Sequence, residues 1–159
     1  MKQTPEMERI QRQMRPGVIS YDGFLGSDKR LLCEIMDADE AAVRRMGLSH
    51  SAIAARMREL REAGARGLGQ TTSVPPHFEV TVDAVRGKLP CPFLHEGLFE
   101  KIYTIVKNNT SGESVTYTDM NIHMIEAHGF YEGEGAPFRQ DPATLARVLE
   151  IVPDESATP

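Results

Sequence analysis

The chain has 159 residues, with 18 Lys and Arg against 23 Asp and Glu, which gives a formal net charge of −5 at pH 7. This length fits one domain or two very small ones. Hydrophobic residues make up 40% of the chain and charged residues 26%, a balance that excludes a wholly disordered or fibrous protein. The excess of acids argues against a surface built throughout for nucleic acid or anionic lipid, although a local basic face can exist within it.

Cysteine content and apolar runs indicate the compartment. The two cysteines, Cys33 and Cys91, are too few for a disulfide framework in a chain of this size, and reduced thiols are typical of cytosolic proteins. The first 14 residues contain only single apolar side chains between polar ones, so we expect no signal peptide. The longest strictly apolar run, residues 52–55, is far shorter than the roughly 20 residues of a membrane-spanning helix. The sequence therefore predicts a cytoplasmic protein with no membrane partner.

The N-terminal part of the chain reads as helical. Thr4 followed by Pro5 is typical of a helix start, and Pro16 and Gly17 end the short amphipathic arm that follows. Three more helices are predicted from serine or aspartate caps and closing glycines. They are a helix capped by Ser27 that runs to Met36, one from Asp37 or Asp39 to Met46, and one from Ser49 to Gly64.

The chain changes character after Gly69. β-prone residues predict strands over 71–74 and 78–85, joined as an open hairpin through Pro75 and Pro76. Residues 98–108 favour a helix, although Ile-Tyr-Thr-Ile-Val within them also fits a strand. The remaining predicted elements are a strand over 114–118, a helix over 119–128 closed by Gly129, a loop over 131–139, a helix opened by Asp141 and Pro142, and a loose tail.

Together these elements predict an α+β protein that is mainly helical. Its N-terminal three-helix segment has a winged helix-turn-helix as one possible form, and a small mixed α/β half follows. The predicted segments are an N-terminal arm and linker over 1–26, a helical segment plus hairpin over 27–88, a C-terminal α+β half over 89–152, and a flexible tail over 153–159.

The run from Met46 to Gly64 has the spacing of a helix-turn-helix, because Gly47 permits a sharp turn and Ser49 caps the next amphipathic helix. It resembles the DNA-binding module of leucine-responsive, AsnC-type regulators, and the hairpin after Gly69 would take the place of the wing. The residues at matching positions are Gly47, Leu48, Ser49, Ser51, Ala52, Ile53, Arg56, Leu60 and Gly64.

This resemblance implies a set of DNA-contacting residues. His50, Ser51, Arg56 and Arg58 would face the DNA, with Arg44 and Arg45 near the phosphates. The alternative is a plain helical hairpin whose arginines and glutamates pair on a solvated face.

Cysteine and histidine spacing suggests a metal site in the C-terminal half. Three residues separate Cys91 from His95, four separate His123 from His128, and zinc accepts such ligands in tetrahedral geometry. In a continuous helix, positions five apart point about 140° away from each other. We therefore expect the latter two histidines to share a metal only if the helix ends before His128. Glu126 is a further candidate as ligand or proton carrier, and the alternative is two ordinary histidines.

Two more features suggest chemistry. Cys91 lies between two prolines and close to Arg86, Lys88 and His95, and such cationic neighbours favour a nucleophilic thiolate; the alternative is a small buried apolar residue. The loop over 131–139 combines glycines, acids, Phe138 and an arginine, as a ligand-covering loop does, although it also fits a plain linker.

Three functions follow from these patterns. The first is a DNA-binding, regulatory or ligand-sensing protein, with DNA, a small molecule and a second copy of the chain as partners. The second is a small metal-binding protein or enzyme with zinc as the cofactor, and the third is an accessory subunit without activity of its own. The metal site of the second would consist of Cys91, His95, His123 and His128.

Overall fold

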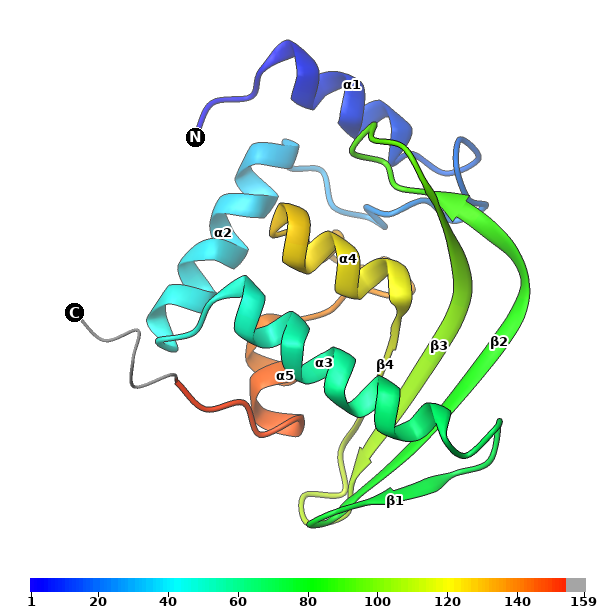
Figure 1. Cartoon of the computed structure of the whole chain (residues 1–159). Coiled ribbons are helices and arrows are strands. Elements are labelled where there is room, and N and C mark those ends of the chain that lie inside the picture. The colour runs from blue at the N-terminus through cyan, green and yellow to red at the C-terminus, as the bar shows by residue number, and fades with distance from the viewer. Residues whose placement is uncertain (154–159) are drawn as a thin grey trace.

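The computed structural model describes residues 1–153, in which helices cover one face of an antiparallel sheet (Figure 1). The predicted tail lies outside the described residues, apart from Pro153. In chain order, the elements are α1 (Pro5–Gln13), α2 (Leu32–Arg45), α3 (His50–Ala65), β1 (Thr72–Val74), β2 (Phe78–Pro90), β3 (Leu98–Asn108), β4 (Ser114–Thr118), α4 (Asp119–His128) and α5 (Pro142–Val148).

The sheet has the strand order β1-β2-β3-β4, with each strand antiparallel to its neighbours. The predicted open hairpin is confirmed as β1 and the first part of β2. Val80 pairs with Val106 of β3, and both side chains are fully buried. β2 and β3 continue well beyond the other two strands as a long curved ribbon (Figure 1). The loop at the end of this ribbon is thereby carried towards α1 and α4.

The prediction of a mainly helical fold with an N-terminal three-helix segment is wrong, because helices and strands share the chain and α4 and α5 follow the sheet. Residues 98–108 form strand β3 instead of the favoured helix. Burial alternates there at Thr104, Val106 and Asn108, the period of a strand. Pairing with β2 on one side and β4 on the other overrides the local helical spacing, as tertiary context often does.

The two helices predicted between Ser27 and Met46 are one helix, α2. Asp39, one of the predicted caps, lies inside this helix and is buried. Its carboxylate accepts hydrogen bonds of 2.6 and 2.8 Å from the guanidinium of Arg139. Asp39 therefore connects α2 to the loop before α5 and does not start a helix.

Helix α3 packs directly on the sheet through Gly64, which is buried. A Cβ atom at this position would lie 2.3 Å from Cγ1 of Val80 in β2. The absence of a side chain thus sets the close approach of helix and strand.

We expect Gly64→Ala to lower the free energy of unfolding by about 1–3 kcal/mol, because the added methyl group overpacks a rigid contact. Urea unfolding of the variant measures this loss. Ser51→Ala serves as the control, since Ser51 is exposed in the same helix and its replacement adds no atom to the core. A Gly64→Ala variant as stable as this control would contradict the account.

A second core lies beneath α1 and beside the end of the β2–β3 ribbon. It combines Met14, Leu32 and Ile35 with Met124 of α4 and with Cys91, which directly follows β2. The ribbon end is thereby held against α4. Within residues 1–153, the helices are all too short or too polar to cross a lipid bilayer.

Candidate metal centre

Four potential metal ligands converge where the loop after β2 meets α4. One ligand atom from each of Cys91, His95, His123 and His128 can be chosen so that all four atoms lie within 4.8 Å of one another. Three of the chain's five histidines take part. The residues singled out by their spacing in the sequence therefore form one cluster that could hold a metal ion.

Cys91 provides the buried side of the cluster, with 3% of its surface exposed. The backbone N–H of Phe93 donates a weak hydrogen bond of 3.5 Å to its Sγ. Burial raises the pKa of the Cys91 thiol, because a thiolate loses solvation in an apolar setting. A bound cation would reverse this effect, since it stabilises the thiolate directly.

His95 lies on the exposed side of the cluster, and the backbone carbonyl of the following residue orients its ring. Its Nδ1 lies 3.1 Å from the carbonyl oxygen of Glu96. A carbonyl can only accept a hydrogen bond, so this contact places the proton on Nδ1 and leaves the lone pair of Nε2 free. Such contacts from a carbonyl to the far ring nitrogen orient histidine ligands in metal sites.

The other two histidines come from α4. Nε2 of His95 lies 2.7 Å from Nε2 of His123 and 3.1 Å from Nε2 of His128. In tetrahedral zinc sites, nitrogen ligands about 2.0–2.1 Å from the metal lie roughly 3.3 Å from one another. The observed separations are shorter than this value, so the rings must move apart to admit an ion.

Helix α4 runs through His128 and is capped by Gly129, as predicted, so the condition that the helix end before His128 is not met. The ring of His128 nevertheless approaches that of His123, with centroids 5.3 Å apart. Side chains on a helix lean towards its N-terminus, which brings the later ring back over the earlier turn. Long imidazole side chains thus compensate for the angular offset of their Cα atoms.

Aromatic rings hold two of the histidines in place. His128 stacks on Phe93 with ring centroids 4.0 Å apart and an angle of 5° between the planes. His123 lies against Phe99 of β3 at 4.4 Å. Sequence spacing gave no sign of these contacts, because each pairs residues at least 24 positions apart that only the fold brings together.

Burial and mutual repulsion keep these rings neutral. The pKa of His123 is lowered, and the pKa of His128 is lowered to about 4, first by burial and then by the neighbouring histidines. Neutral imidazole is the form that donates a lone pair to a metal. The environment of the cluster therefore favours a bound metal cation over protonation of these histidines.

Two other sequence hypotheses find less support in this region. Glu126 receives two hydrogen bonds of 3.0 Å from the guanidinium of Arg58, so its carboxylate is already engaged on the surface. The raised pKa of Cys91 opposes the thiolate that a catalytic nucleophile needs.

The DNA-contact candidates lie on α2 and α3, and several of them contact neighbours in the fold. His50 joins the hydroxyl of Tyr131, 2.8 Å from its Nδ1, to the carboxylate of Glu40. Arg44 forms an exposed ion pair with the same glutamate. Arg56 donates to the carbonyl of Leu149 at 2.9 Å and also pairs with Glu59.

Three of these candidates, Arg44, Arg45 and Ser51, are exposed, and Arg58 pairs with Glu126 as described above. Nothing in this arrangement tests DNA binding, which stays a prediction. Comparisons of this chain with protein-family models, curated proteins and solved structures found no significant match.

Proposed function

We propose that this protein binds a transition metal ion, with zinc as the best fit, through Cys91, His95, His123 and His128. The observation that carries this proposal is the convergence of one thiol and three imidazoles from two separate segments. One sulfur and three nitrogen ligands match the preference of zinc for thiolate and imidazole.

Four protein ligands fill a tetrahedral coordination sphere, which is typical of structural zinc sites. Cys91 and His95 lie in the loop between β2 and β3, whereas His123 and His128 belong to α4. A shared ion would thus fasten the end of the long ribbon to the helix that it covers. We infer that the metal orders this part of the fold.

Elemental analysis of protein purified without chelators tests the proposal, and we expect about one zinc ion per chain. Cobalt(II) should replace zinc and give the visible absorption of a tetrahedral site together with a sulfur-to-cobalt charge-transfer band. Cys91→Ser should remove that band, and His123→Ala should lower the bound metal to a small fraction.

His77→Ala is the matched control, because His77 pairs with Glu150 at 2.5 Å and is not part of the cluster. Its metal content should equal that of the unmodified protein. A folded protein that takes up no metal, or equal uptake by His123→Ala and His77→Ala, would refute the proposal.

A further inference from the structure

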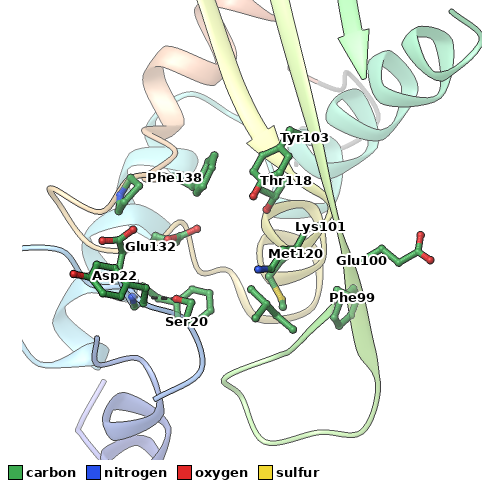
Figure 2. A pocket seen from close by; sticks show the side chains of 15 residues that line it. Ser20, Asp22, Phe99, Glu100, Lys101, Tyr103, Thr118, Met120, Glu132 and Phe138 are labelled. Atoms are coloured by element: carbon green, nitrogen blue, oxygen red, sulfur yellow. Dashed lines mark hydrogen bonds between the residues drawn. The ribbon is translucent and has the colours of Figure 1, made fainter. Parts of the chain in front are cut away.

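A cavity of about 230 Å³ (Figure 2) is lined in part by Phe99, which also lies against His123 of the histidine cluster. It is enclosed by the start of α4, the end of the β2–β3 ribbon, the segment 20–24 and the loop 131–139. The sequence suggested a ligand-covering role for this loop, and three of its residues, Glu132, Pro137 and Phe138, line the cavity. The volume suits a small organic molecule.

Aromatic residues make up one third of the residues that line this cavity. Although the chain has only six phenylalanines and four tyrosines, five of these residues line it. Tyr103 of β3 and Phe138 of the loop contact each other across it, with ring centroids 5.3 Å apart. The aromatic lining residues are Tyr21, Phe24, Phe99, Tyr103 and Phe138. Faces of such rings attract cations.

One carboxyl group, that of Glu132, is buried in this apolar setting, with 4% of the residue exposed. Its Oε2 accepts a hydrogen bond of 2.6 Å from Nδ2 of Asn121, in the first turn of α4. The backbone of Glu132 has a φ of +68°, a left-handed conformation that costs energy in a residue with a side chain. The loop thus holds this carboxyl in place against a local preference.

The carboxyl group of Glu132 has no cationic partner among residues 1–153. The nearby guanidinium of Arg139 donates to the backbone carbonyl of Glu132 and to Asp39 instead. Oε1 of Glu132 forms no hydrogen bond in the described part of the chain, yet it is not among the fully enclosed polar atoms. Because Glu132 lines the cavity, this oxygen is open to a bound molecule.

We propose that the cavity binds a small organic cation, in which a protonated amine is joined to an apolar body. The ammonium group would displace the proton that burial keeps on the carboxyl group of Glu132 and would pair with the resulting carboxylate, while the aromatic rings would line the space around the ligand. A charged hydrogen bond to a buried carboxylate is among the stronger polar contacts. This proposal does not depend on the metal centre.

The other charged residues around the cavity determine which probes are needed. Asp22 adds negative charge to the lining, whereas Lys101 of β3 adds a positive charge. Glu100 lies next to Lys101 in the strand but points away from the other labelled side chains (Figure 2). An anionic probe must therefore be included, because Lys101 offers the only competing cation among the lining residues that the structure describes.

Three probes with the same ring distinguish recognition of a cation from recognition of an anion and from binding through apolar contacts alone. Benzylamine, benzyl alcohol and benzoate can be titrated into the protein as purified, with chemical-shift changes as the readout. The titrations are done at about pH 8.5, where Glu132 has mostly released its proton and the amine still carries most of its charge. We expect benzylamine to bind roughly tenfold more tightly than benzyl alcohol, and benzoate to bind least, because only the amine forms a charged hydrogen bond with Glu132.

Two isosteric variants locate the contact. Glu132→Gln should weaken benzylamine binding roughly tenfold while leaving benzyl alcohol unchanged. Glu134→Gln, which removes an exposed carboxylate from the same loop outside the cavity lining, should leave both unchanged. Absence of benzylamine binding, equal binding of amine and alcohol, or preference for benzoate would overturn the proposal. The comparison of probes on the unmodified protein needs no variant to fold.

Discussion

Zinc is expected to raise the free energy of unfolding by about 4 kcal/mol when its free concentration is 1,000 times its dissociation constant. An ion that binds only the folded chain stabilises it by mass action, and Cys91 and the three histidines converge only in the fold. Urea unfolding with zinc, and again with excess chelator, measures the gain. The proposed site predicts that the gain depends on all four ligands.

His128→Ala should abolish this zinc-dependent gain. The variant also loses the stack on Phe93, so its metal-free stability will differ from that of the unmodified protein. The zinc effect is therefore taken as the difference in the free energy of unfolding between zinc and chelator within each protein, which removes the difference in metal-free stability. His77→Ala should keep the full gain, and an equal zinc effect in both variants would contradict a site at the cluster.

Glu132→Gln is expected to remove a strong pH dependence from the stability of this protein. Burial raises the pKa of Glu132 from its ordinary value of 4.5 to about 8. Between these two values, the folded chain holds a proton that the unfolded chain has released. The free energy of unfolding therefore falls as pH rises through this interval, with a contribution from Glu132 on the order of 4 kcal/mol.

Urea unfolding of both proteins over this pH range, at constant metal content, tests the sign and the size of this pH dependence. All other titratable groups are the same in both proteins, so the difference between them isolates Glu132. We expect Glu132→Gln to gain stability relative to the unmodified protein as pH rises, with most of the gain reached by about pH 8. Parallel curves would show that the pKa of Glu132 is not raised.

The start of α3 and both ends of α4 were predictable from local sequence, whereas α2 begins after Leu31 instead of Ser27 and has no break at Asp37 or Asp39. Ser49 accepts from the N–H of Ala52 and Thr118 accepts from that of Asn121, as their positions before apolar periods indicate. Gly129 ends α4 in the left-handed conformation. These features depend on neighbours within four residues along the chain, so sequence alone carries the information.

Strand β3 illustrates what local reasoning missed. Its helical spacing of isoleucines and valine was genuine, but β2 and β4 supply hydrogen bonds on both sides, and such pairing depends on segments distant in the sequence. The same reason explains Asp39, whose partner Arg139 lies 100 positions away. Local sequence patterns contain no information about which distant segment will pack against a given residue.

For the two candidate sites, too, some features follow from the sequence and others only from the tertiary structure. Sequence by itself determined the ligand types at Cys91, His95, His123 and His128, because residue identity and spacing are read directly from the sequence. Only the tertiary structure decided that the four meet, since that requires the β2–β3 ribbon to bring its loop to α4. It alone also revealed the buried carboxyl of Glu132, which has no cationic partner within residues 1–153, because this burial arises from packing between segments that are far apart in the chain.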